Sequence, residues 1–157
     1  MLTSTEKAAL QAARNQRFIL NRAQEDYDTA VASCVAVGAQ KIDGMPHGNS
    51  VPHGLETGYI AVERQKKTLE RETALFEKYE RRARAVMTKM EPALYGFCLF
   101  FYLQAKSTSE TAAAINRSER QCQRYRRETK MDGVADDDDD GAGMPPIYQA
   151  INRYAQA

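Results

Sequence analysis

The sequence has few of the residues that mark several classes of protein. Its 157 residues contain no tryptophan, two histidines and three cysteines. The cysteines (Cys34, Cys98 and Cys122) lie far apart, and no CxxC pair or Cys/His ligand spacing occurs. This usage predicts reduced, partly buried thiols in a cytosol, and it excludes a disulfide framework.

Long apolar runs are missing too. No signal peptide is evident at the N-terminus, and the most apolar stretch, Tyr95 to Leu103, is too short to cross a bilayer. We therefore interpret that stretch as a core helix and expect no membrane partner.

Motifs for catalysis are equally scarce. Both histidines, His47 and His53, lie in a small Pro-His-Gly repeat within a stretch rich in glycine and proline. A metal site is one interpretation, but two histidines with few acidic neighbours make a poor zinc site, and a connector is favoured. No GxSxG elbow and no nucleophile–base pair occur, so we expect no enzyme, metal or cofactor.

The net charge of +1 hides a strong segregation of charge. Asp132 and Asp136 to Asp140 place six negative charges in one short segment. Without those six, 22 basic residues face 15 acidic ones, which is a net charge of +7. A basic body with an acidic tail is typical of a DNA-binding protein.

Two long helices are predicted for residues 4–89. Thr3 and Glu6 have capping-box spacing, so a helix begins near Ser4 and runs to about Val35. Along this helix, residues spaced alternately three and four positions apart form a pattern like the seam of a coiled coil. They are Leu10, Ala13, Arg17, Leu20, Gln24, Tyr27, Val31 and Cys34. The seam serves either dimerisation or packing within the chain, and both readings stay open.

A glycine- and proline-rich loop at about 37–58 separates this helix from a second one, at about 57–89. Val62, Leu69, Phe76, Ala83 and Met90 recur there every seven residues. A loop of that length allows the second helix to fold back on the first. We therefore predict a long, coiled-coil-like helical hairpin.

Residues 90–130 predict a smaller helical domain. Pro92 suits the first turn of an apolar helix. Ser107 with Glu110, and Ser118 with Gln121, then repeat the spacing of helix starts, and Asn116 is left for a left-handed turn between them. This arrangement is two short helices joined by a tight turn.

The second of these short helices is basic. From Ser118 to Lys130 there are five basic residues and two acidic ones, with Cys122 and Tyr125 on one face. Arginine pairs with guanine and glutamine with adenine in the major groove, which favours DNA binding. An ordinary solvated basic face is the alternative, and charge alone does not decide between them.

The segment from Met90 to Lys130 resembles the helix-turn-helix of sigma-factor region four. It is more similar still to that of RinA/ArpU/LlgA-type phage late-gene regulators. The matching residues are Leu94, Phe97 and Leu99–Tyr102, then Ser109–Ala112, Ile115–Ser118, Cys122, Tyr125 and Arg126. Gly44–Gly48 resembles a Gly-Met-Pro-basic-Gly loop of the same proteins, although His47 stands where arginine or lysine is usual.

This resemblance implies an all-α phage or prophage regulator in the bacterial host cytoplasm. It would bind double-stranded promoter DNA and activate late packaging and structural genes, with RNA polymerase as a possible further partner and oligomerisation through the long helices. The expected DNA-binding residues are Arg117, Ser118, Arg120, Gln121, Gln123, Arg124, Arg126, Arg127 and Lys130. A small terminase subunit for DNA packaging, or an antitermination factor that binds RNA polymerase, is the alternative.

Residues 131–157 are interpreted as an acidic linker followed by a short helix. Ile147, Ile151 and Tyr154 share one helical face. The acidic run either solubilises the chain or mimics DNA and covers the basic helix until DNA competes.

Overall fold

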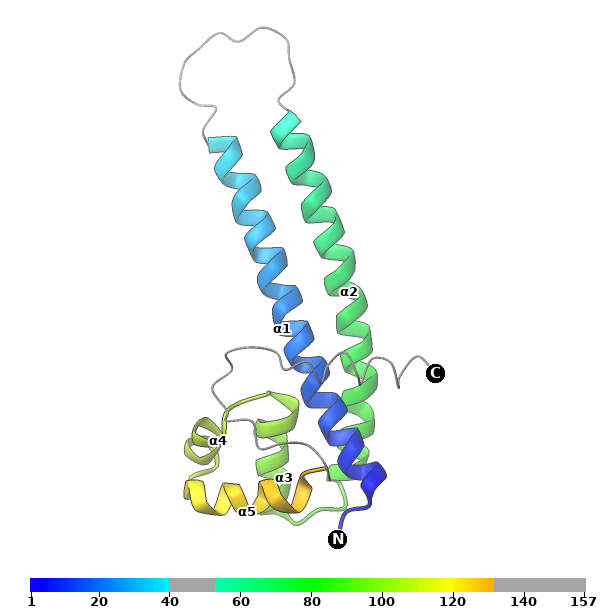
Figure 1. Cartoon of the computed structure of the whole chain (residues 1–157), viewed down its shortest axis with the longest axis vertical. Coiled ribbons are helices and arrows are strands. Elements are labelled where there is room, and N and C mark those ends of the chain that lie inside the picture. The colour runs from blue at the N-terminus through cyan, green and yellow to red at the C-terminus, as the bar shows by residue number, and fades with distance from the viewer. Residues whose placement is uncertain (40–52, 132–157) are drawn as a thin grey trace, which may run out of the picture. The chain divides into compact units, whose positions relative to one another are not determined.

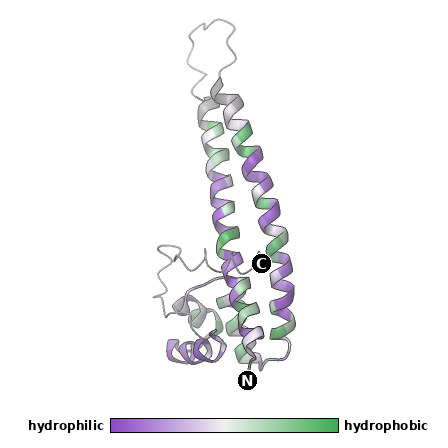
Figure 2. Ribbon diagram, turned by 45° about the vertical axis from the view of Figure 1, so that its right-hand side comes forward, coloured by the Kyte–Doolittle hydropathy of each residue, from purple (hydrophilic) through white to green (hydrophobic). Residues whose placement is uncertain are grey.

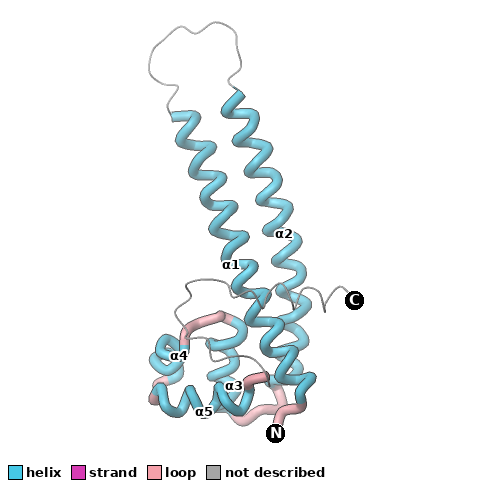
Figure 3. Tube along the Cα trace, in the orientation of Figure 1, coloured by secondary structure: helices cyan, strands magenta, loops and turns pink. Residues whose placement is uncertain are grey.

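The computed structural model describes residues 1–39 and 53–131, and every regular element in these two ranges is a helix (Figures 1 and 3). The elements are α1 (Ser4–Ala39), α2 (His53–Met87), α3 (Pro92–Cys98), the π-helix η2 (Leu99–Leu103), α4 (Thr108–Ile115) and α5 (Glu119–Thr129). The all-α prediction is confirmed for this part of the chain. No helix in it is both long enough and apolar enough to cross a membrane.

The chain forms two compact units. One comprises Met1–Arg17 and the described residues from Lys78 onward, and we call it the core unit. The other comprises Phe18–Glu77, and we call it the two-helix unit. This division passes through α1 and α2, whereas the sequence suggested domains at 4–89 and 90–130.

The core unit holds the main hydrophobic cluster of the protein. The first turns of α1 and the last turns of α2 contribute Leu10 and Met87, which are fully buried together with Phe97 of α3. Phe97 stacks on Phe101 with ring centroids 5.0 Å apart, and Tyr102 meets Phe101 edge to face at the same distance. The predicted core helix is thereby confirmed. Leu10 and Met87 are buried in the same cluster as these rings, which explains why the ends of the long helices belong to this unit.

In the two-helix unit, α1 and α2 lie side by side (Figure 1). A Cβ atom at Gly58 would stand 3.3 Å from Cys34 Sγ, so glycine allows close approach of the two helices there. The predicted loop at 37–58 was too long, because α1 continues to Ala39 and α2 begins at His53. Glycines that signalled a loop in the sequence are accommodated inside α2. The Gly44–Gly48 motif lies outside the described residues.

The predicted seam of α1 is wrong in part. Gln24 is exposed, and its neighbour Ala23 is buried instead. In the core unit, Arg14, Asn15 and Gln16 are buried although none belongs to the seam. A seam describes a helix with one covered face, but α1 is covered more widely where other helices surround it.

The π-helix η2 was not predicted. The Gln104 N–H donates to the Leu99 carbonyl at 3.2 Å, and the Lys106 N–H donates to the Phe100 carbonyl at 3.1 Å. Ala105 ends this widened turn in the left-handed conformation, with φ of 52°. Arg14 supplies the missing donor: its guanidinium donates to the carbonyls of Phe101 and Lys106 and lies 3.8 Å from the centre of the Phe101 ring. A buried arginine therefore satisfies backbone acceptors that the π-turn leaves open.

Candidate nucleic-acid interface

The first element of the candidate site is α4, and its start is fixed by a complete capping box. Ser107 Oγ accepts a hydrogen bond from the Glu110 N–H at 3.2 Å, and Glu110 Oε2 accepts one from the Ser107 N–H at 2.9 Å. The predicted cap is confirmed. Two backbone donors that a helix start leaves free are thereby satisfied.

The turn between α4 and α5 has the predicted left-handed residue. Asn116 adopts φ 52° and ψ 50°, and the following Arg117 N–H donates to the Ala112 carbonyl at 3.0 Å. Asparagine tolerates this conformation better than most residues. The chain then enters α5 after a turn of only three residues.

The start of α5 has half of the predicted capping box. Ser118 Oγ accepts from the Gln121 N–H at 3.3 Å. In a full capping box the Gln121 side chain would accept from the Ser118 N–H. Here its oxygen instead accepts from the Ser118 hydroxyl at 3.5 Å. Both residues are thus engaged in the local cap.

One face of α5 packs into the core unit. Cys122 and Thr129 are buried, and Tyr125 lies against Phe97 with ring centroids 5.7 Å apart. The Tyr102 hydroxyl and Thr129 Oγ1 share a hydrogen bond of 2.8 Å, and burial raises the pKa of Tyr102 to about 12. Burial also raises the pKa of the Cys122 thiol. The predicted apolar face is confirmed, and it fixes the rotation of α5.

A contact that the sequence did not reveal joins the two helices. Ser109 of α4 donates a hydrogen bond of 2.9 Å to Glu119 in the first turn of α5. Serine and glutamate ten residues apart carry no local signal, so only the fold shows the pair. This bond holds the carboxylate of Glu119 beside α4.

The outward face of α5 carries the basic side chains. Arg117 in the turn and Arg120, Arg124 and Arg127 on the helix are all exposed. Arg120, Arg124 and Arg127 are four and three residues apart, which places them on one side of α5, and Arg117 lies just before the helix begins. We call these four residues the arginine stripe. Within the described ranges, no ion pair involves any of these four guanidinium groups.

The other predicted DNA-binding residues lie differently. Gln123 is exposed between Arg120 and Arg124 in the sequence, whereas Arg126 is half-buried, with its guanidinium 5.5 Å from the centre of the Phe101 ring. Lys130 is half-buried just after α5. The fold therefore separates Arg126 from the arginine stripe.

Metal chemistry has no candidate site in the ranges 1–39 and 53–131, because no cluster of three or more His, Cys, Asp or Glu residues with ligand geometry occurs there. Comparison of the chain with protein-family models, with curated proteins and with solved structures gave no match. The arginine stripe and the helices that hold it are therefore the features of the described residues that bear on function.

Proposed function

We propose that α4 and α5 form a helix-turn-helix, and that the chain binds double-stranded DNA as a phage transcription regulator. The observation that carries the proposal is the arginine stripe: three exposed guanidinium groups on one face of a short helix, and a fourth, that of Arg117, in the turn before it. An α-helix with its side chains is about 10–12 Å across, so α5 suits insertion into a major groove about 12 Å wide.

Different side chains of α5 would contact the bases and the phosphates. Arg120 and Arg124 lie nearest the base edges, where an arginine pairs bidentately with guanine. Exposed Gln123 offers the amide geometry that adenine accepts. Arg117 and Arg127, at the two ends of the stripe, serve phosphates and set the register.

The contacts that hold α5 in place suit a helix that binds DNA. Its buried face holds the helix against α3 and η2, and the Ser109–Glu119 bond holds one acidic side chain beside α4. A rigid, pre-oriented helix loses little conformational entropy on binding. The late-gene role comes from the resemblance to RinA/ArpU/LlgA-type regulators, in which such a helix would occupy promoter DNA and activate packaging and structural genes.

The test is binding to DNA fragments that span the gene for this chain and its neighbours, in rising salt. Arg120→Ala/Arg124→Ala is compared with Arg81→Ala/Arg82→Ala, whose exposed arginines lie on α2. We expect one tightly bound promoter fragment. Loss of each bidentate contact costs about 1–3 kcal/mol, so the first variant, which loses two, binds that fragment roughly thirtyfold more weakly or worse.

The control variant keeps its preference for that fragment. Equal binding of all fragments, or equal behaviour of the two variants, would contradict recognition by α5. Preferred binding to a packaging start site instead of a promoter would point to the terminase alternative.

A further inference from the structure

An exposed carboxylate lies among the basic side chains at the start of α5. Glu119 is the first residue of the helix, and in the sequence it stands close to Arg117 and next to Arg120. Figure 2 shows that the ribbon of α5 is mostly hydrophilic. No ion pair joins Glu119 to either arginine in the part of the chain that the structure describes. The negative charge of Glu119 is therefore not used in a salt bridge there.

A hydrogen bond from α4 fixes the position of this carboxylate. Ser109 Oγ donates to Glu119 Oε1 at 2.9 Å, and both residues are exposed. The bond restrains a side chain with several rotatable bonds, so less rotamer entropy is lost when a partner binds it. The second oxygen, Oε2, has no hydrogen bond within residues 1–39 and 53–131, so it offers a pre-positioned acceptor.

The surroundings of Glu119 also favour its ionised form when a partner displaces water. A carboxylate that loses its water is costly unless other groups bind it. Ser109 supplies one hydrogen bond, and the first turn of α5 lies at the positive end of the helix dipole. Glu119 can therefore stay ionised within an interface, where it only accepts hydrogen bonds.

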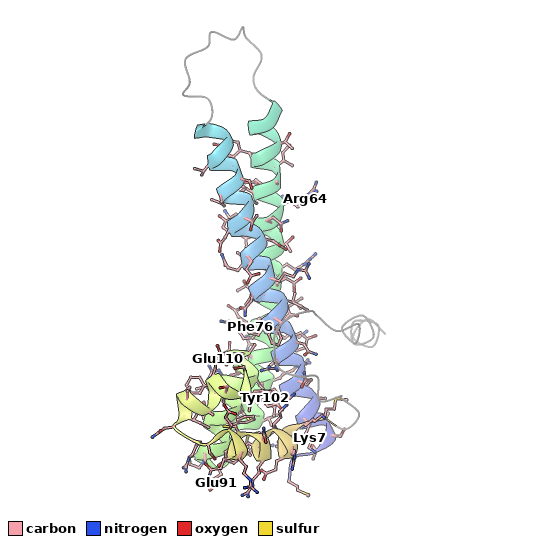
Figure 4. The ribbon with its side chains drawn as sticks, turned by 60° about the vertical axis from the view of Figure 1, so that its left-hand side comes forward. Lys7, Arg64, Phe76, Glu91, Tyr102 and Glu110 are labelled. Carbon is pink, nitrogen blue, oxygen red and sulfur yellow. The ribbon has the colours of Figure 1, made fainter. Side chains whose placement is uncertain are left out.

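The rotation of α5 sets where Glu119 points. Tyr102 lies in the interior of the core unit (Figure 4), and its hydroxyl shares a hydrogen bond of 2.8 Å with Thr129 of α5. Glu119 and Gln123 are four residues apart, so they lie on the same side of the helix, and Arg120 occupies the adjacent side. Glu119 therefore borders the arginine stripe on the side toward α4.

We propose that Glu119 is a specificity-determining residue, which accepts a hydrogen bond from the N4 amino group of a cytosine, and that Ser109 positions it. This inference rests on the proposed DNA binding by α5. Phosphates are anionic and repel a carboxylate, so its partners on a duplex are the amino groups of the bases. In the major groove, guanine and thymine present acceptors, and adenine has an acceptor beside its amino group. Cytosine presents the donor alone, which makes it the best match.

The test is selection of bound sequences from a pool of random duplexes by the full chain. We expect the parent to prefer cytosine at one position by roughly fivefold or more. Glu119→Gln keeps the size of the side chain and still accepts from Ser109, but an amide pairs with adenine. The preference at that position therefore moves from cytosine toward adenine, while the preferences that depend on Arg120 and Arg124 remain.

Glu128→Gln is the matched control, because Glu128 is the other exposed acidic residue of α5 and lies in its last turn. Both variants remove one negative charge and bind every duplex more tightly, but only Glu119→Gln changes a base preference. Ser109→Ala tests the positioning role. It lowers the cytosine preference about twofold or more and leaves the other positions and the thermal unfolding of the free chain unchanged.

The outcomes separate this inference from the proposed function. Loss of the cytosine preference in Glu119→Gln, with Glu128→Gln like the parent, supports the contact. Suppose instead that the parent's preferences disappear in Arg120→Ala/Arg124→Ala but persist unchanged in Glu119→Gln. The role of Glu119 is then overturned, and recognition by α5 stands. A parent chain that selects no sequence would overturn both.

Discussion

At the scale of single residues, Arg14 is the least expected feature of the protein. Its side chain is 8% exposed, and its guanidinium donates to the carbonyls of Phe101 and Lys106. Arginine is almost never buried without partners. Here the partners are backbone oxygens at the end of η2, so a residue on α1 completes a turn about ninety positions later in the chain.

We expect Arg14→Met to lower the free energy of unfolding by about 2–4 kcal/mol. Methionine keeps much of the volume but removes the donor from the buried Phe101 carbonyl and from the half-buried Lys106 carbonyl. An unsatisfied buried carbonyl costs about 1–3 kcal/mol, and a half-buried one costs about 1 kcal/mol because water reaches it. Urea unfolding measures the loss. Arg22→Met, at an exposed position of the same helix, is the control and stays within about 0.5 kcal/mol of the parent. Equal losses in the two variants would show that the carbonyl bonds contribute nothing.

Ala105 is a second residue-scale feature, because it holds a left-handed backbone with φ of 52°. A side chain in this region costs about 1–2 kcal/mol, a strain that glycine does not carry. Ala105→Gly should therefore raise the free energy of unfolding by about 1 kcal/mol, and thermal unfolding would report it as a higher Tm. Ala114→Gly, at an exposed position inside α4, should have the opposite sign. A lower Tm for Ala105→Gly would show that the turn does not strain alanine.

At the scale of elements, the helix ends near the candidate site were predictable because their signals are local. The caps at Ser107 and Ser118 and the left-handed Asn116 follow from residues at most three positions apart. The start of α1 and the start of α3 at Pro92 were predicted from equally local signals. Local hydrogen bonds of this kind form from side chains and backbone in sequence neighbours.

Other elements were not predictable because they depend on contacts between residues far apart in the sequence. The π-helix η2 depends on Arg14 and on the packing of Phe101, which is a long-range contact. Gly58 lies inside α2 and closely approaches Cys34 of α1, whereas the sequence shows only a glycine that usually breaks a helix. Which basic residues of α5 face outward also depended on the packing of Tyr125 against Phe97.

The two caps make a prediction for α4 and α5. Ser107→Ala removes a complete capping box, whereas Ser118→Ala removes a single cap bond. Loss of a cap costs about 1 kcal/mol, so both variants melt earlier, and Ser107→Ala has the larger effect. Thermal unfolding by circular dichroism measures both. Ser33→Ala, exposed in the middle of α1, should not lower the Tm because alanine favours a helix. A larger effect for Ser118→Ala would reverse the ranking of the caps.

At the scale of the whole molecule, hydrophobic burial is unevenly distributed. The core unit gathers the aromatic cluster around Phe97, whereas the two-helix unit buries Ala23 and Phe76. The heptad pattern predicted long helices correctly, but it did not reveal this inequality, because a pattern names the apolar face and not what covers it. Local stability follows the density of buried contacts.

This inequality leads to a prediction for amide hydrogen exchange. If the seam of α1 serves dimerisation, a second copy covers the two-helix unit, and amides of residues 18–35 and 57–77 are protected more strongly as protein concentration rises. By mass action, each tenfold increase in partner well above the Kd adds about 1.4 kcal/mol to the free energy of opening. Amides of α3, η2 and α5 lie in the core unit, and their protection should not change with concentration.

Exchange followed by mass spectrometry at two concentrations on either side of the Kd separates the possibilities. Strong, concentration-independent protection of the two-helix unit would mean that two helices with Ala23 and Phe76 between them are stable alone. In that case packing between α1 and α2 contributes more than the burial of their side chains indicates, and the seam of α1 serves packing within the chain.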